Sequence, residues 1–257
     1  MKILIVCFLM FTTSLSNLFS QINLVQNPGM EDFMECPDEY SCIGMDAEIF
    51  YWVDKWMSPT YATPDYFNVC SVEHVGIPAS DMADYQPARS GEAYCGIILF
   101  TLEVENYREY IQVELSGQGL KEGVCYEVEF YVNPGYNVEG YPSLYLTTDK
   151  IGAYFSIDRL FDFGTYVSLP VTPQIQNPAG QFFNDTSSWQ IVSGIYEATG
   201  GEKWLTIGNF YNNASTDLEM VVGDTIEDEF KTAYVFIEDV SVTACFEDST
   251  TFIQNNN

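Results

Sequence analysis

Histidine and basic residues are scarce in this 257-residue chain, which has 1 His and 9 Lys and Arg against 37 Asp and Glu. Hydrolysis by an activated serine or cysteine usually needs an imidazole beside the nucleophile, and a catalytic zinc ion needs several His or Cys ligands. The lone His74 lies in a loop-like stretch, and neither a G-x-S-x-G motif nor a glycine-rich phosphate loop is present. We therefore predict a non-catalytic protein. Carboxylate-pair glycoside hydrolysis stays open only because so many acids allow many pairs.

The shortage of positive charge also excludes two classes of partner. The formal net charge is −28, and no cluster of Lys or Arg interrupts the acidic residues. Coulomb repulsion opposes binding to nucleic acid or to an anionic bilayer. The same acidity suits a protein that binds divalent cations, although solubility alone also accounts for it.

Long hydrophobic runs are missing as well. The longest, residues 3–11, is far shorter than the roughly 20 apolar residues that a membrane-spanning helix needs. It follows Lys2 and precedes small or polar residues up to Ser20, which is typical of a secretory signal peptide. We expect residues 1–20 to be removed on export, and the protein to be extracellular, on the cell surface or in the periplasm.

Removal of that segment leaves six of the seven cysteines, and zinc-type C-x-x-C pairs are absent. An even number of cysteines in an exported chain predicts disulfides. Cys125 opens one predicted strand and Cys245 closes another, both on the less apolar face, so antiparallel neighbours would place them opposite each other. We predict a Cys125–Cys245 bond. We also expect the other four to pair among themselves, in an order that the sequence leaves open: Cys36, Cys42, Cys70 and Cys95.

Alternation of apolar and polar residues recurs along most of the chain, whereas no ten-residue stretch keeps a helical period. With 47% hydrophobic residues, the chain can fill a core. We predict an all-β, antiparallel jelly-roll sandwich in a single domain, residues 21–247, with cysteine-stapled loops in 36–90 and a polar tail, 248–257. The predicted strands are 22–27, 93–100, 109–115, 125–132, 151–157, 189–198, 203–211 and 233–242.

The stretch "NYREYIQVEL" (106–115) carries a polar side opposite an apolar one. Arg108, Tyr110, Gln112 and Glu114 share that polar side. Aromatic, guanidinium, amide and acid groups held on a rigid sheet are those that bind sugars, so Arg108, Tyr110 and Gln112 are candidate ligand-binding residues. A solvated outer sheet face has the same composition and remains the alternative. The loop "NFYNNASTD" (209–217) is a second candidate, or else an ordinary polar turn.

Several motifs carry a resemblance to known proteins. The opening "NLVQNPGMEDF" and the closing "YVFIEDVSV" resemble the first and last strands of jelly-roll carbohydrate-binding modules with a galactose-binding-like β-sandwich. The ordered motifs "SPTYATPDYFNVC", "ARSGEAYCGI", "TPQIQNP" and "GGEKWLTIGNFYNNASTD" resemble those of a group of exported Bacteroidetes proteins. The resemblance covers roughly residues 22–245, and it implies a fold and a compartment rather than an activity.

Many carbohydrate modules of that fold hold a structural calcium ion between an N-terminal Glu and an acid of the last strand. The resemblance implies Glu31 and Asp239 as calcium ligands, with Glu238 as a contender because it replaces the first of two family aspartates. Met30 also departs from the family, where an aromatic residue precedes the Glu. By alternation Glu238 shares a face with Val240 and points inward unless a bulge intervenes, and an inward carboxylate needs a partner such as a hard cation.

Two functions of different classes follow. The first is an exported, non-catalytic, calcium-stabilised module that binds a polysaccharide or surface glycan. The alternative is a structural or adhesive subunit of a surface assembly that binds protein partners.

Overall fold

The computed structural model describes residues 21–44, 53–72, 74–137, 144–162, 166–221 and 231–245. The predicted signal peptide, 1–20, and the predicted tail, 248–257, lie outside these residues. Within them, we find no helix with the length and apolar character needed to cross a bilayer. The helical content of the described part is a single 3-10 turn, η1 (Asn213–Ser215).

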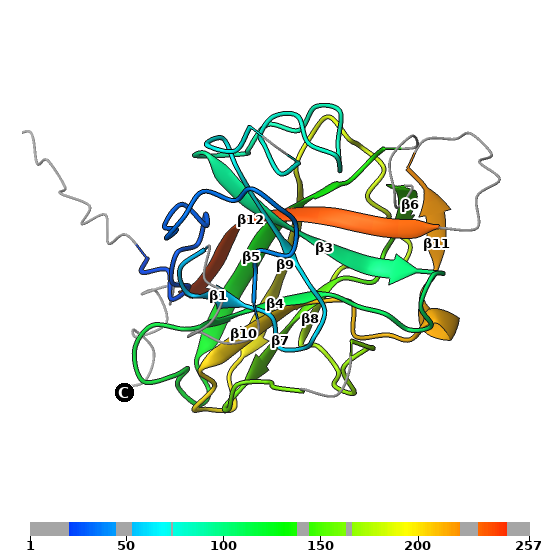
Figure 1. The fold of residues 1–257 in the computed structure, drawn as a ribbon. Helices are drawn as coiled ribbons and strands as arrows, with labels where there is room; N and C mark the ends of the chain where they lie inside the picture. The colour runs from blue at the N-terminus through cyan, green and yellow to red at the C-terminus, as the bar shows by residue number, and fades with distance from the viewer. Residues whose placement is uncertain are drawn as a thin grey trace, which may run out of the picture.

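Two sheets form the body of the molecule, so the prediction of an all-β antiparallel sandwich is confirmed (Figure 1). The five-stranded sheet has the order β1 (Trp56–Met57), β4 (Tyr110–Glu114), β10 (Trp204–Gly208), β7 (Gly152–Ser156) and β8 (Ile175–Gln176). The seven-stranded sheet contains β11 (Leu218–Met220), β6 (Leu144–Thr148), β12 (Thr232–Ala244), β3 (Ala93–Thr101) and β2 (Asp65–Asn68), with β5 (Cys125–Pro134) beside β12 and β9 (Gln190–Glu197) beside β5.

The main core lies between the sheets. Ile111 and Val113 of β4 alternate with polar residues and enter this core, as do Leu205 and Ile207 of β10. Phe130 of β5 belongs to the same cluster from the seven-stranded side, together with its alternating neighbours. A second cluster covers the other face of the seven-stranded sheet, where the loop 74–90 packs over aromatic residues of β2, β3 and β12. Period-two alternation is therefore the feature of the sequence that determines the fold.

One predicted strand is not formed. Residues 22–27 make only a single bridge, between Val25 and Leu115. The Asn23 side chain accepts a hydrogen bond from Val242 N at 3.0 Å and donates one to Val240 O at 3.0 Å, so it takes the place of ladder bonds that a strand backbone would make. The structure also adds strands that the pattern did not predict, most clearly β6.

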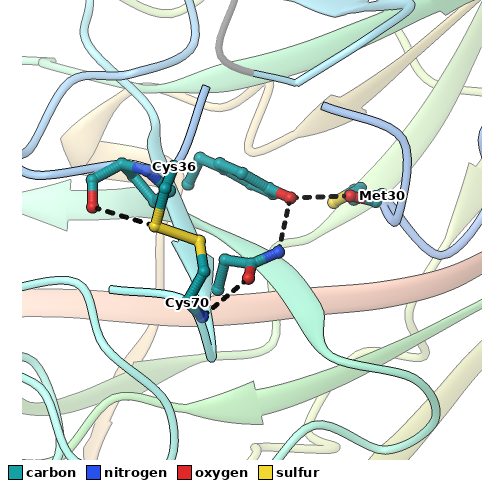
Figure 2. The surroundings of a disulfide bond; sticks show 6 residues. Met30, Cys36 and Cys70 are labelled. Carbon is teal, nitrogen blue, oxygen red and sulfur yellow. Dashed lines mark hydrogen bonds between the residues drawn. A yellow bond between two sulfur atoms is a disulfide. The ribbon is translucent and has the colours of Figure 1, made fainter. Parts of the chain in front are cut away.

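The predicted Cys125–Cys245 disulfide is present, with Cα atoms 5.4 Å apart. The antiparallel register of β12 and β5 places the two cysteines just past the Ala244–Tyr126 pair. Cys36 and Cys70 form the second disulfide, with Cα atoms 6.0 Å apart. Figure 2 shows this bond beside a chain of hydrogen bonds that reaches back to Met30.

The prediction that all four N-terminal cysteines pair is wrong. Cys42 and Cys95 are both buried free thiols. The Cys42 sulfur faces the Glu39 carbonyl oxygen at 2.7 Å, and Cys95 lies in the middle of β3 within the main core. Burial raises the pKa of the Cys42 thiol to about 12 and that of Cys95 well above its usual value. Both therefore act as small apolar core residues.

A bulge in β12 intervenes beside Glu238, and this is the one condition under which the sequence does not place Glu238 inward. The register against β5 pairs Glu238 with Tyr131 and Ser241 with Glu129, so β12 contains one extra residue. Asp239 adopts the left-handed backbone region there, with φ of +51°. Because of this bulge, Glu238 lies on the face opposite Ile237 and Val240, which both enter the main core. Glu238 is fully buried, but beneath the segment 89–92 and not between the sheets.

Candidate functional site

The predicted polar stripe lies on the outer face of the five-stranded sheet, as alternation requires, but much of it is covered. Arg108, Tyr110 and Gln112 are all fully buried, and only Glu114 is exposed. Each of the three donates a hydrogen bond to a backbone carbonyl of a covering loop, namely Tyr211, Asn209 and Leu160 in turn. The expectation of an open, ligand-facing stripe is therefore wrong, because loops returning from β7 and β10 cover it.

Arg108 anchors the loop 209–217 to the sheet. Its guanidinium donates to Tyr211 O at 3.1 Å, to Asn213 Oδ1 at 2.9 Å and to Thr216 Oγ1 at 3.2 Å. Burial lowers its pKa to about 10, so the side chain stays charged at neutral pH. Arg108, a candidate ligand-binding residue in the sequence, therefore holds in place the loop 209–217, which was the second candidate site.

A polar pocket opens beside this loop, with a cavity volume of about 150 Å³. Its wall comes from the β6–β7 turn, from the end of β8 and the residues that follow it, and from the anchored loop. The lining residues are Asp149, Lys150, Ile151, Gln176, Asn177, Ala179 and Tyr211. Tyr211 is half-buried, Gln176 is exposed, and Lys150 is partly exposed, so an aromatic ring, an amide and an ammonium group all reach the opening.

One lysine faces two carboxylates at the pocket. Lys150 Nζ lies 2.9 Å from Asp149 Oδ1 and 3.5 Å from Asp217 Oδ2, and it faces the Tyr211 ring centroid at 6.0 Å. Partial burial opposes the charged form of Lys150, but the bonds and charges of Asp149 and Asp217 outweigh it and raise the Lys150 pKa. Asp149 also accepts a hydrogen bond from Gly180 N at 2.7 Å. The floor of the pocket is thus rigid and polar.

Asn177 fixes one wall of the pocket. Its Nδ2 atom donates to Gln181 O at 2.7 Å and to Asp149 O at 3.2 Å. The sequence flagged Tyr211 through the loop 209–217 but gave no signal for Lys150 or Gln176. Lys150 comes from the β6–β7 turn and Gln176 from the end of β8, and only the sheet topology brings them into one pocket with Tyr211.

A second hollow, of about 250 Å³, lies over the seven-stranded sheet and has fewer polar side chains available to a ligand. Its polar groups are engaged within the protein: Tyr107 donates its hydroxyl to Glu109 Oε1 at 2.7 Å, and Thr232 donates to Thr101 Oγ1 at 3.1 Å. We therefore regard the Tyr211 pocket as the better candidate for a ligand.

The three predicted calcium ligands all meet the segment 89–92. Glu238 accepts hydrogen bonds from Arg89 N and Ser90 N, both at 2.6 Å. Asp239 pairs with the Arg89 guanidinium and accepts from Ser90 Oγ at 2.8 Å. Both carboxylate oxygens of Glu31 face Glu92 N, at 3.0 and 3.1 Å. Burial, partly offset by the two backbone bonds, raises the pKa of Glu238 to about 7.

This cluster fits calcium in the kind of donor but not fully in arrangement. Carboxylate oxygens are the ligands that calcium prefers, and three acids exceed the single charge of Arg89. All six oxygens, however, already face N–H or O–H donors of the segment 89–92. Among the residues that the structure describes, no group of three or more His, Cys, Asp or Glu side chains is placed to hold one metal ion.

His74 lies near the protein surface, 2.8 Å from Asp81 Oδ2, and Tyr40 donates its hydroxyl to the same carboxylate. These contacts tie the loop 74–90 to the segment around residue 40. His74 is therefore a residue of a surface loop, as the sequence around it predicts.

No protein-family model matches the chain, and no curated protein matches it. Among solved structures, the CBM22-1 xylan-binding domain of Paenibacillus barcinonensis Xyn10C is 12% identical over 82% of this chain and 97% of that one, with a TM-score of 0.37. TmCBM61 in complex with β-1,4-galactotriose is 13% identical over 87% and 99%, with a TM-score of 0.32. The K1 cleaved adhesin domain of Lys-gingipain from Porphyromonas gingivalis W83 is 14% identical over 81% and 97%, with a TM-score of 0.33. At these scores the likenesses identify no ligand for this chain, whose function has to be argued from its own geometry.

Proposed function

We propose that this protein is an exported, non-catalytic glycan-binding module that holds a sugar ring in the Tyr211 pocket. The observation that carries the proposal is the meeting of the Tyr211 ring with Lys150 and Gln176 at the mouth of a rigid cavity. Aromatic rings pack under the C–H face of a sugar, while amide and charged groups bind its hydroxyls. The two disulfides support an oxidising compartment and hence export.

The size of the pocket favours a single ring. Its cavity of about 150 Å³ is smaller than the roughly 300–1,000 Å³ of sites for drug-sized ligands. A terminal sugar or a branch therefore suits it better than several rings of a continuous chain. Lys150, the more exposed member of the Lys150–Asp149 pair, can donate to a hydroxyl group of the ring, and the Gln176 amide can both donate and accept.

The test is a glycan array, followed by calorimetry on any retained glycan, with the Tyr211→Ala, Tyr211→Phe and Tyr85→Ala variants. Loss of the ring should weaken binding at least about fivefold, because one sugar–aromatic contact contributes on the order of 1 kcal/mol or more. Tyr211→Phe keeps the platform and should bind nearly as the native protein does. Tyr85, an exposed tyrosine in the loop 74–90, is the matched control and should have no effect.

Two results would contradict the proposal. One is an array on which no glycan is retained. The other is equal binding by the Tyr211→Ala and Tyr85→Ala variants, which would move the ligand away from this pocket.

Calcium binding at Glu31, Glu238 and Asp239 is the second part of the proposal. Because Arg89 pairs with Asp239, calcium has to compete with a guanidinium, so we expect weak binding in the native protein. Arg89→Gln removes the competing charge. If the lost repulsion between Arg89 and the ion amounts to about 1.4 kcal/mol, the variant should bind Ca²⁺ about tenfold more tightly.

Calorimetry and thermal unfolding with added CaCl₂, after treatment with a chelator, measure this difference. MgCl₂ is the ion control, and Arg159→Gln is the control variant, because Arg159 lies away from the cluster against Met57 and Phe161. If Ca²⁺ shifts the melting temperature of neither the native protein nor Arg89→Gln, the calcium part of the proposal fails and the glycan part stands unaffected.

A further inference from the structure

In the part of the chain that the structure describes, a sheet face over β12, β5 and β9 is exposed to solvent. Val128, Phe130 and Val192 point from these strands into the main core, so their sequence neighbours point outward. The registers pair Glu127 with Ile195 and Tyr131 with Ile191, and they place Glu197 opposite Cys125. We name this surface the acidic–aliphatic face, defined by Glu127, Glu129, Tyr131, Ile191, Ile195 and Glu197.

The apolar residues of this face lie on its outermost strand. Ile191 and Ile195 are 46% and 63% exposed, and they stand four residues apart on the same side of β9. Two β-branched aliphatic side chains in line on an exposed strand are costly to leave in water. Glu127 and Glu197 flank Ile195 on the same surface and are themselves exposed.

β9 is also an edge strand without the usual protection. It pairs with β5 alone among the described strands. Its eight residues, "QIVSGIYE", include neither Lys nor Pro, the residues that most often block pairing along a free edge. A long edge of this kind is a template for an added strand, whose side chains would continue the rows of the acidic–aliphatic face.

The face already holds one guanidinium. Arg89 extends over it from the segment 89–92, with its Cζ atom 3.4 Å from the centroid of the Tyr131 ring, and pairs with Asp239. Stacking on an aromatic ring beside a carboxylate is a favourable setting for arginine. The remaining acids, Glu127, Glu129 and Glu197, have no ion-pair partner among the described residues. The open part therefore offers carboxylates like the one that Arg89 pairs with, and aliphatic side chains in place of the aromatic ring.

We propose that the acidic–aliphatic face binds an extended cationic segment of another protein, which adds as a strand to the free edge of β9. Aliphatic side chains of that strand would pack on Ile191 and Ile195, and its Arg or Lys side chains would lie across β9 toward Glu127 and Glu129. The strand of those acids is about 10 Å from the added one, two strand spacings, which a long basic side chain can span. A second copy of this chain fits poorly, because its net charge of −28 sets acids against acids.

The test uses a labelled ten-residue peptide with alternating Arg and Val, and fluorescence polarisation as the readout. Native protein should bind it, and Glu127→Lys/Glu129→Lys should bind at least about tenfold more weakly, because repulsion replaces attraction. The matched control, Glu103→Lys/Glu105→Lys, makes the same change of net charge on the exposed loop after β3 and should bind as the native protein does. Oligoarginine should bind more weakly than the alternating peptide, since it lacks the aliphatic contacts.

Three results of the peptide titrations overturn the proposal: no binding of the alternating peptide, equal weakening in both charge-reversed variants, or equal binding of oligoarginine. If the Glu127→Lys/Glu129→Lys variant fails to fold, Ile191→Ser/Ile195→Ser tests the same face at exposed positions and should also lose binding. Self-association that this second variant abolishes would assign the face to another copy of the chain and so overturn the cationic partner.

Discussion

Asp65 and Glu109 are carboxylic acids buried beneath the outer surface of the seven-stranded sheet. Tyr234 donates its hydroxyl to Asp65 Oδ2 at 2.7 Å, and Ile98 N donates to Glu109 Oε2 at 2.8 Å. Gly96 makes the Tyr234 contact possible, because a Cβ atom there would lie 1.9 Å from the tyrosine oxygen. A single absent methyl group thus lets one side chain reach across a strand to an acid.

Burial changes the acidity of both groups. It raises the pKa of Asp65 to about 6 and, with the nearby charge of Asp65, the pKa of Glu109 to about 8. The folded protein therefore binds more protons than the unfolded chain between about pH 4 and 8. The stability that these two acids contribute is fully present below their pKa values in the unfolded chain. It is lost as pH rises through their pKa values in the folded protein.

We expect the free energy of unfolding to fall from pH 4.5 to pH 8, by about 1.4 kcal/mol per pH unit for each proton difference. Glu109→Gln, which imitates the protonated acid, should flatten this slope and be the more stable protein at pH 8. Glu238, whose pKa burial raises to about 7, leaves part of the slope in both proteins. Urea unfolding at the two pH values measures the difference. An unchanged slope in Glu109→Gln would mean that Glu109 is ionised throughout this range.

At the scale of elements, short segments between strands decide what the sheets can bind. The loop after β10 returns over β4, and its only short helix, η1, is capped by Asn212, whose side chain accepts a bond from Ser215 N. Arg108 fastens this loop from below, which leaves Tyr211 at the mouth of the pocket. The bulge at Asp239 acts similarly in β12, where it turns two adjacent acids toward the segment 89–92.

Arg108→Met should destabilise the protein by about 3 kcal/mol, because it leaves buried acceptors of the loop without a donor. It should also weaken glycan binding although Arg108 does not line the pocket, since the Tyr211 backbone loses its anchor. Denaturant unfolding and calorimetry measure the two effects. Arg159→Met is the control: this partly buried arginine rests on the Phe161 ring at 4.4 Å, and we expect less than about 1 kcal/mol. Equal costs for the two variants would contradict the anchoring role.

At the scale of the whole molecule, the two sheets present different outer surfaces. The five-stranded sheet is roofed by loops over β4, with the Tyr211 pocket beside them. The seven-stranded sheet is covered by the loop 74–90 on one part, and most of its residues on the outer side of β5 and β9 are exposed or partly exposed within the described ranges. A net charge of −28 makes the long-range field repulsive to other acidic molecules, so attraction to cationic partners should weaken with added salt.

The sequence by itself determined the class of fold and one disulfide. Alternation in segments such as 125–132 and 234–245 is a local property, and pairing those two strands was enough to place Cys125 opposite Cys245. It could not distinguish Cys36 and Cys70 from Cys42 and Cys95, because pairing within irregular loops depends on how those loops pack. The sequence also predicted correctly that the polar side chains of 106–115 point away from the main core.

Only the tertiary structure decided which polar face is open. The pattern predicts Arg108, Tyr110 and Gln112 as surface residues, because nothing local shows that loops 48 to 103 residues away in sequence will cover them. Glu129 and Tyr131 carry the same kind of pattern but stay partly exposed in the described structure. Alternation predicts the side of a strand on which a residue lies. Contacts between segments far apart in the sequence decide what covers that side, and such contacts also bring Lys150, Gln176 and Tyr211 into one pocket.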